Sequence, residues 1–287
     1  MYRPSGHDVE LTEEEFRLLR DFIHERFGLF FDDAQRASLR ARLEGRLAGL
    51  DLASFEDYYH YLRFGPERAE ELDRMIVHLT NNETYFFRES AQLQVFADPI
   101  LKQIKESKSA SGEHTLRVLS AGCSTGEEAH TLAMIVHDSG LFFWGWDVQV
   151  HGMDVDPAAM EKAGRATYFH NSFRSVSEAV LERHFIRQGP GSQVRDGIRR
   201  LVHLRRGNLL EAQSYEGLAP LDALFCRNVL IYFSDGAILK AVRLFHEALA
   251  PGGYLFLGHA ESLSRITDLF TPIRFQGAIV YRKAEGA

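Results

Sequence analysis

The chain has 287 residues, of which 45% are hydrophobic and 25% charged, which is ordinary for a globular protein and long enough for a full core and a second small domain. A formal net charge of −7 argues against general nucleic-acid binding, and no apolar run reaches the roughly 20 residues that a membrane-spanning helix needs. The segment before Phe16 has no apolar signal-peptide core, so we expect a cytoplasmic protein with two free cysteines, and no cysteine or histidine spacing predicts a metal site.

Four helices are predicted ahead of residue 80, because apolar residues recur there at helical spacing. Thr12 and Ser54 are expected to cap the first and third of these helices, and Gly28 is expected to end the first. The predicted ranges are 11–27, 33–50, 54–64 and 67–79. These residues form a small helical unit with no chemistry of its own.

The second predicted helix carries four arginines on the side away from its leucines. They are Arg36, Arg40, Arg42 and Arg46. They make two i,i+4 pairs of like charge, which repel one another in an isolated helix. A solvated face is the general explanation of such a cluster. The functional alternative is a docking face for an acidic partner, since an opposite surface would relieve the repulsion.

Residues 81–90, NNETYFFRES, combine polar groups, aromatic rings and one arginine. A loop of this composition is usually half core. However, Asn82, Thr84 and Arg88 are hydrogen-bonding types that suit an amino-acid moiety or a carboxylate. A helix is predicted to follow through Ile104, and a polar linker is predicted from 105 to 114.

Residues 116–136 predict a buried strand, a small-residue loop and a helix, which is the first unit of a nucleotide-binding α/β domain. Gly122 and Gly126 would let the backbone of the loop approach a ligand closely. Glu127 and Glu128 open the helix and would repel a diphosphate, and the G-x-G-x-x-G fingerprint is absent. A nucleoside with a positive centre, such as S-adenosylmethionine, therefore fits better, unless both glutamates only complement the helix dipole on a solvated surface.

The second predicted strand, 148–153, ends in two acids. Asp154 is placed to hold ribose hydroxyls, because an acid at this strand end takes that role in dinucleotide sites. Asp156 precedes Pro157 and is predicted to cap the helix 158–165.

The second half of the chain continues the strand and helix alternation. Residues 176–185 are predicted to be helical, and the glycine- and arginine-rich segment 186–200 is predicted to form short antiparallel strands around Val194, Ile198 and Val202. The remaining predicted elements are strands at 201–204, 221–225 and 254–258, a helix at 235–249, and a final hairpin of 273–275 with 278–281.

Four residues of different segments are predicted to follow strand ends. They are Gly122, Asp154, Asn208 and Asn228. Ligands of doubly wound sheets bind at the carboxyl ends of strands, so we expect all four in one crevice.

Seven segments together resemble the chemotaxis receptor glutamate methyltransferases, the CheR family, over about residues 11–283. They are the arginine-rich second helix, NNETYFFRE, SAGCSTGEEAHTLAM, MDVD, GNLLE, FCRNVLIYF and GGYLFLGHAESL. The resemblance implies an α/β fold, with a doubly wound Rossmann-like S-adenosylmethionine-dependent methyltransferase sheet, a small all-helical N-terminal domain and a small β-subdomain insert. The implied parts are a receptor-docking helical domain at 1–80, a linker and helix at 81–113 that contribute to the cofactor site, and the methyltransferase domain at 114–287 with its insert at about 186–200.

The resemblance also implies the activity and the site. Glutamate side chains on the cytoplasmic helical bundle of chemoreceptors would become methyl esters for sensory adaptation, with S-adenosyl-L-homocysteine as the product. Arg88 and Tyr232 match the residues near the methyl-transfer centre. Position by position, the family's cofactor contacts fall on Asn82, Thr84, Arg88, Glu128, Asp154, Asn208, Leu209, Arg227 and Asn228.

A glutamate carboxylate is already anionic at neutral pH, so this reaction needs no general base and depends mainly on alignment. We expect Tyr232 to orient the substrate carboxylate, and Arg88 to hold the cofactor's carboxylate or attract the substrate. The insert is shorter than in enteric relatives, so we expect no tight binding of a receptor's carboxy-terminal peptide.

Two alternatives remain open: a methyltransferase of the same fold that acts on RNA or another protein, and a non-catalytic cofactor-binding module. Adenine-N6 methyltransferases usually carry an [N/D]-P-P-aromatic loop where this chain has Arg227-Asn228-Val229-Leu230. We expect a monomer that neither binds nucleic acid nor inserts into a membrane.

Overall fold

The computed structural model of the chain describes residues 9–285. By its internal contacts the chain divides into two units. A helical unit runs up to Asn81 and includes Tyr232–Ser234, and an α/β unit contains Asn82–Ile231 and the chain from Asp235 onward. The described residues do not include the predicted domain limits at residues 1 and 287. They also do not include the start of the segment before Phe16, in which no signal-peptide core was found. In the described range, every helix is too short or too polar to cross a bilayer.

The helical unit contains the four predicted helices. They are α1 (Glu13–Phe27), α2 (Arg36–Leu50, preceded by the 3₁₀ turn η1, Asp33–Gln35), α3 (Phe55–Phe64) and α4 (Arg68–Leu79). Thr12 and Glu15 form a reciprocal capping box at the start of α1, and Gly28 ends that helix in the left-handed conformation with φ 77°. Ser54 caps α3 by accepting the backbone N–H of Asp57. These local signals confirm the predicted helix ends.

The α/β unit is built on a seven-stranded sheet with the order β6-β2-β1-β7-β8-β10-β9. The first five strands in that order are parallel, and the final hairpin joins β8 antiparallel. The strands are β1 (Thr115–Ala121), β2 (Asp147–Asp154), β6 (Val202–Arg206), β7 (Leu221–Cys226), β8 (Leu249–Leu257), β9 (Thr271–Phe275) and β10 (Ala278–Arg282). Every residue of β7 is buried, as its largely apolar sequence predicts for a central parallel strand, and Asp222 is buried with the rest.

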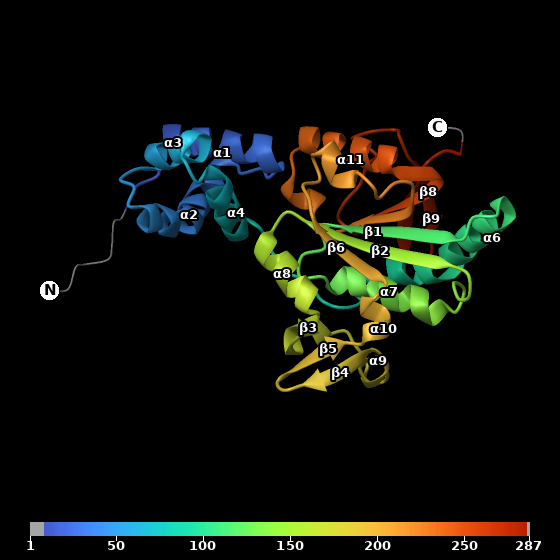
Figure 1. Cartoon of the computed structure of the whole chain (residues 1–287). Coiled ribbons are helices and arrows are strands. Elements are labelled where there is room, and N and C mark those ends of the chain that lie inside the picture. The colour runs from blue at the N-terminus through green and yellow to red at the C-terminus, as the bar shows by residue number, and fades with distance from the viewer. Residues whose placement is uncertain (1–8, 286–287) are drawn as a thin grey trace. The chain divides into compact units, whose positions relative to one another are not determined.

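Helices cover both faces of this sheet, which confirms the doubly wound prediction. Figure 1 shows α7 (Glu127–Ser139) and α8 (Pro157–Arg165) on one face and α11 (Asp235–Ala248) on the other. The helical segment before β1 consists of α5 (Ser90–Val95), the π-helical turn η2 (Phe96–Ile100) and α6 (Leu101–Ser111). The short 3₁₀ turns η4 (Ala212–Tyr215) and η5 (Leu230–Tyr232) complete the connections.

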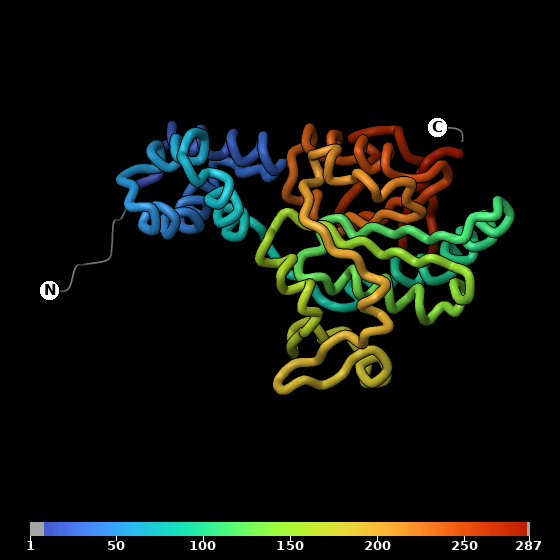
Figure 2. Tube along the Cα trace, in the orientation of Figure 1, coloured from blue at the N-terminus to red at the C-terminus, as the bar shows by residue number. Residues whose placement is uncertain are grey.

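A small three-stranded antiparallel sheet lies between β2 and β6 in the chain. Its order is β3 (Thr167–Tyr168), β5 (Gly191–Val194) and β4 (Phe185–Gln188), and it is accompanied by η3 (His170–Phe173), α9 (Glu178–His184) and α10 (Asp196–Arg199). The chain leaves α8, forms this sheet and returns through α10 to β6 (Figure 2).

Two predictions of local structure were wrong. Residues 105–111 continue α6 instead of forming a linker, because Lys108 is buried and its Nζ lies 3.0 Å from the Asp222 carboxylate. Ile198 lies in the helix α10 and not in a strand. Val194, Ile198 and Val202 recur every four residues, which is closer to helical spacing than to strand alternation. The small sheet also begins earlier than residue 186, at Thr167.

Candidate functional site

The glycine loop between β1 and α7 is held tightly by its protein neighbours. Gly122 has φ 78°, and a Cβ there would lie 2.5 Å from the Val229 side chain. Gly126 has φ 93°, and its Cβ would lie 2.8 Å from that of Ala163. Both glycines are therefore required by backbone conformation and by packing, which is a stronger constraint than the ligand approach that the sequence suggested.

Asp154 is buried at the end of β2, and both of its oxygens accept backbone N–H groups. Ser124 donates to one oxygen at 2.7 Å and Asp156 to the other at 2.9 Å. Burial raises the pKa of Asp154, against the opposing effect of these amides. A carboxylate has about four acceptor positions, so capacity for ribose hydroxyls remains beside these two bonds. Asp154 therefore fixes the glycine loop and can also serve a ligand.

Asp154→Asn is expected to weaken binding of S-adenosylhomocysteine by about tenfold or more, because an amide would place N–H against N–H in this cluster. Calorimetry on the variant measures this directly. The control is Asp147→Asn at the opposite end of β2, where the exposed carboxylate accepts a hydrogen bond from half-buried Gln149. Unchanged affinity in Asp154→Asn would remove this carboxylate from the site.

Asp156 is the cap that the sequence predicted, since its Oδ1 accepts the N–H groups of Ala158 and Ala159 at 2.8 and 3.0 Å. Its other oxygen accepts Asn82 Nδ2 at 2.7 Å. The Asn82 carbonyl in turn accepts the Ser124 hydroxyl at 2.9 Å. The polar loop that starts at residue 82 is therefore joined to the glycine loop through Asn82.

The other predicted groups of that loop have fewer partners. Arg88 is half-buried, donates to the Glu83 carbonyl at 2.8 Å and lies over the Tyr85 ring at 5.7 Å. Thr84 is half-buried, and its hydroxyl has no hydrogen-bond partner among residues 9–285.

Two groups of opposite charge, Arg227 and Glu128, face each other at the start of α7 as an ion pair without a hydrogen bond, which we call the open charge pair. Arg227 Nε lies 3.6 Å from Glu128 Oε2, with side-chain exposures of 1% and 16%. Ser120 donates to the other Glu128 oxygen at 2.7 Å. Burial raises the pKa of Glu128, while the Arg227 charge and the Ser120 bond oppose that rise. A separation of 3.6 Å is too long for a hydrogen bond, and Arg227 Nε has no other partner in the described structure.

Glu127 does not lie on a solvated surface either. It is 2% exposed, and its two oxygens accept the hydroxyls of Thr125 and Ser172 at 2.6 and 2.8 Å. Burial raises its pKa, opposed by these two hydrogen bonds. Complementation of the helix dipole at the surface is thus the wrong explanation for the pair of glutamates, since their carboxylates are held inside the structure.

Asn228 follows β7 in a left-handed conformation with φ 60°. Its side-chain N–H donates to Glu89 at 3.0 Å, and its Oδ1 is buried with no partner in the part of the chain that the structure describes. Buried polar groups are nearly always hydrogen-bonded, so an unpartnered acceptor beside an open charge pair indicates a ligand position.

Two glutamates that sequence reasoning did not single out hold this loop. One carboxylate, that of Glu261, accepts four backbone N–H groups, from Asn228, Val229, Ile231 and Gly258 at 2.6–3.2 Å. The other, Glu89, accepts His259 as well as Asn228. Burial raises the pKa of Glu89, but the hydrogen bonds from His259 and Asn228 and the Arg227 charge bring it below its usual value. In the sequence, Glu89 in FFRES and Glu261 in HAESL were the residues that could have indicated this role.

Asn208 closes the turn after β6. Its Oδ1 accepts the Leu210 N–H at 3.0 Å, and its Nδ2 donates to Glu211 at 3.3 Å. Leu209 is buried, and its carbonyl accepts the Tyr215 hydroxyl at 3.1 Å. These bonds give both residues a structural role in the turn at the carboxyl end of β6.

Tyr232 belongs by its contacts to the helical unit. Its phenol oxygen accepts Asn81 Nδ2 at 2.9 Å, and the side chain is 38% exposed. The hydroxyl proton has no acceptor in the described residues, so this phenol is oriented and can donate.

The four arginines of α2 do not form a single free face. Arg46 makes two bonds to Glu71 at 2.8 and 2.6 Å, and Arg42 donates to the Leu79 carbonyl at 2.7 Å. Arg40 lies 3.7 Å from Glu44, and Arg36 is exposed. Of the four arginines predicted to dock a partner, Arg46 already neutralises a fully buried carboxylate within the helical unit.

The glycine loop, the acid at the end of β2 and the open charge pair define a cofactor-binding domain of the α/β methyltransferase class. The model of the CheR methyltransferase all-alpha domain matches residues 14–80, and that of the CheR methyltransferase SAM binding domain matches residues 82–279. The chain belongs to the CheR methyltransferase family.

Individual relatives match most of the chain. "Chemotaxis protein methyltransferase 2" of Vibrio cholerae is 35% identical over 277 residues, which cover 96% of this chain and 95% of that protein. "Chemotaxis protein methyltransferase" of Escherichia coli is 34% identical and covers 95% and 92%. "Probable biofilm formation methyltransferase WspC" of Pseudomonas aeruginosa is 31% identical and covers 92% of this chain and 61% of that protein.

Proposed function

We propose that this chain is an S-adenosylmethionine-dependent protein-glutamate O-methyltransferase that esterifies glutamates in the cytoplasmic helical bundle of chemoreceptors. The open pair of Arg227 and Glu128 is the observation that carries the cofactor assignment. The methionine part of the cofactor is a zwitterion, whose ammonium suits Glu128 and the Asn228 carbonyl and whose carboxylate suits an arginine. An opposite-charge pair without a hydrogen bond, next to an amide oxygen that has no partner in the described residues, fits such a ligand.

The proposed cofactor residues are those that the sequence suggested. Glu128, Arg227 and Asn228 would hold the amino-acid end, and Asp154 would accept the ribose hydroxyls. Asn82 fixes the glycine loop from one side, and the turn of Asn208 and Leu209 bounds the crevice at β6. Thr84 and Arg88 complete the set from the loop that precedes α5.

The bound cofactor supplies an activated methyl group. The chain's task is to align a substrate carboxylate oxygen with that carbon, and no general base is needed because the carboxylate is ionised at neutral pH. Charge disappears on both reactants as the bond forms, so a strong cation on the attacking carboxylate would stabilise the ground state more than the transition state. The neutral Tyr232 hydroxyl, oriented by Asn81, suits this role.

Transfer from radiolabelled S-adenosylmethionine tests the function. A chemoreceptor cytoplasmic fragment and a structured RNA are offered together to the purified chain. We expect label on the receptor fragment alone. Label on RNA would favour the nucleic-acid alternative, and cofactor binding without any transfer would favour the binding module.

Tyr232→Phe is expected to lower kcat by about ten- to a hundredfold and to leave the affinity for S-adenosylhomocysteine unchanged, because only an orienting donor to the substrate is lost. Arg88→Ala is expected to lower both quantities. Steady-state kinetics and calorimetry on the two variants separate the effects. Equal losses of cofactor affinity would refute this division of roles.

The arginines of α2, Arg36, Arg40, Arg42 and Arg46, are proposed to dock the receptor. The test uses Arg36 and Arg40, because Arg42 and Arg46 also hold the helical unit together. Charge reversal of Arg36 and Arg40 to glutamate should raise the Michaelis constant for the receptor and leave cofactor affinity unchanged. The contact should weaken with salt, since exposed charges are screened over about 8 Å at physiological ionic strength. The control is Arg17→Glu on α1, another exposed arginine in an i,i+4 pair. A salt-independent Michaelis constant in the unmodified chain would argue against this surface.

The proposed parts are a docking unit at 1–80, a connecting segment at 81–113 and the methyltransferase domain at 114–287. A cytoplasmic, monomeric enzyme is the form that fits this substrate.

A further inference from the structure

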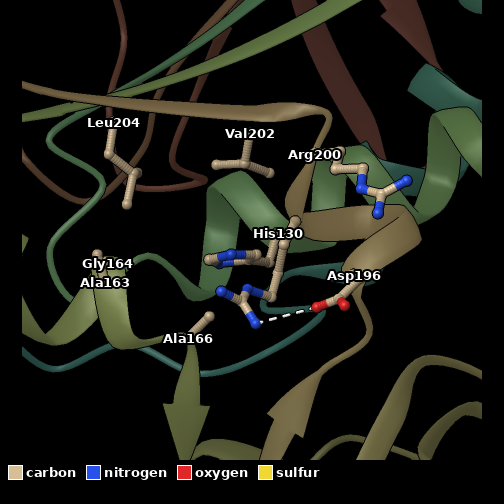
Figure 3. Close-up of a pocket in the computed structure, with 9 residues that line it drawn as sticks. His130, Ala163, Gly164, Ala166, Asp196, Arg200, Val202 and Leu204 are labelled. Atoms are coloured by element: carbon tan, nitrogen blue, oxygen red, sulfur yellow. Dashed lines mark hydrogen bonds and ion pairs between the residues drawn. The ribbon is translucent and has the colours of Figure 1, made fainter.

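A cavity of about 310 Å³ lies at the outer edge of the large sheet, and none of the proposed cofactor residues lines it (Figure 3). Its volume falls in the range of about 300–1,000 Å³ that small-molecule sites occupy. The lining residues come from α7, α8, α10 and β6: His130, Ala163, Gly164, Ala166, Asp196, Arg199, Arg200, Val202 and Leu204.

One wall of the cavity is apolar. Val202 and Leu204 project from β6 toward the cavity and are only half-buried, because β6 is the edge strand of the sheet (Figure 3). Ala163 and Gly164 at the end of α8 are too small to cover them. A flat apolar body would remove this surface from water.

The rim of the cavity is cationic. Arg200 is exposed, and its guanidinium has no partner in the residues that the structure describes. Arg199 lies 3.1 Å from Asp196, but their side chains are 37% and 75% exposed, so this pair is weak and can open. Figure 3 shows the Arg200 side chain directed away from His130 and Asp196, so Arg199 is the guanidinium that a carboxylate or a phosphate in the cavity would meet.

The inner end of the cavity is a buried histidine that contacts the glycine loop. His130 is 2% exposed, and its Nδ1 lies 2.8 Å from the Gly126 carbonyl and 3.1 Å from the Tyr168 hydroxyl. That hydroxyl donates to the Thr125 carbonyl at 2.9 Å. Burial lowers the pKa of His130 to about 4, so the ring is neutral at pH 7, with its proton on Nδ1. Nε2 is then an acceptor without a partner in the described chain.

We propose that this cavity binds a small organic anion, with its carboxylate or phosphate on Arg199, its flat body against Val202 and Leu204, and a hydroxyl or amine donor toward His130 Nε2. Because His130 bonds the Gly126 carbonyl directly, occupancy of the cavity changes cofactor affinity. This second part rests on the proposed cofactor site at the glycine loop.

The probe is 4-hydroxybenzoate, which has an anionic group, a flat ring and a donor. Calorimetry on the full chain should show saturable binding, which weakens about tenfold or more in the Arg199→Gln variant and is unchanged in Arg187→Gln on β4. The neutral analogue 4-hydroxybenzyl alcohol should bind at least about tenfold more weakly to the unmodified chain. No saturable binding, or equal affinity in the Arg199→Gln variant, would overturn the site.

The coupling is tested by titrating S-adenosylhomocysteine with and without saturating 4-hydroxybenzoate. We expect a change of about twofold or more in its dissociation constant, and the same factor for 4-hydroxybenzoate when the order is reversed. An unchanged constant would overturn the coupling. Failure to bind S-adenosylhomocysteine in the absence of the probe would instead contradict the proposed function, because probe binding is measured separately.

Discussion

Glu261→Gln is expected to reduce methyl transfer by at least about a hundredfold, because displacement of an aligned group by about 1 Å can cost that much. The Glu261 carboxylate accepts four backbone N–H groups and thereby fixes the loop of Arg227 and Asn228. A glutamine would turn an N–H donor toward at least one of these amides. Each buried amide that loses its acceptor costs about 1–3 kcal/mol.

Kinetics and chemical denaturation on the full chain measure the two consequences. Glu247→Gln on the exposed side of α11 is the matched control, with the same change of charge and no such cluster. Cofactor affinity should fall together with turnover in Glu261→Gln, since Asn228 is part of the proposed site. The expected loss of activity is about a hundredfold. An activity within about threefold of that of the unmodified chain would therefore show that the loop keeps its geometry without this carboxylate.

Arg46→Met is expected to destabilise the helical unit by about 3–5 kcal/mol, the usual cost of removing one member of a buried ion pair. Glu71 is fully buried, and Arg46 donates two hydrogen bonds to it at 2.6 and 2.8 Å, whereas the exposed Arg74 lies farther away at 3.8 Å. Tyr58 also donates to Glu71, at 2.8 Å, and would remain as its nearest partner. Burial and the proximity of Glu71 raise the pKa of the Tyr58 hydroxyl beyond its usual range, so it stays protonated and cannot replace the lost charge.

Hydrogen exchange of the amides in α2, α3 and α4 reports this loss within the full chain. Arg36→Met on the same helix is the control, since Arg36 is exposed. Adding Glu71→Leu to Arg46→Met should recover much of the stability, because no buried charge is then left unpaired. Equal protection of these amides from exchange in Arg46→Met and Arg36→Met would show that the Arg46–Glu71 ion pair does not stabilise the helical unit.

The fold was largely predictable because its signals are local. The capping box at Thr12, the left-handed Gly28 and the cap at Asp156, which is followed by a proline, each act within a few residues of the helix end that they define. The strand-end rule also placed Asp154 and Asn228 correctly at the carboxyl ends of β2 and β7, the two parallel strands that flank β1.

The partners of the site residues were not predictable, because they come from distant parts of the chain. Arg46 and Glu71 are 25 residues apart, and only the packing of α2 against α4 brings them together. Glu261 reaches Asn228 over 33 residues, through a carboxylate that has no local signature. Residue types at strand ends indicate a crevice. Which hydrogen-bond acceptors in that crevice have a protein partner, and which have none, depends on the tertiary structure.

Mass spectrometry of a chemoreceptor cytoplasmic fragment tests the central claim most directly. The fragment is incubated with the chain and S-adenosylmethionine carrying a deuterated methyl group, and its peptides are then sequenced before and after mild alkali. The account predicts labelled methyl groups on glutamate side chains, lost in alkali because they are esters, and no label with the Tyr232→Phe and Arg88→Ala double variant. Label that survives alkali, or that lies on lysine, arginine or a backbone amine, would contradict carboxylate methylation.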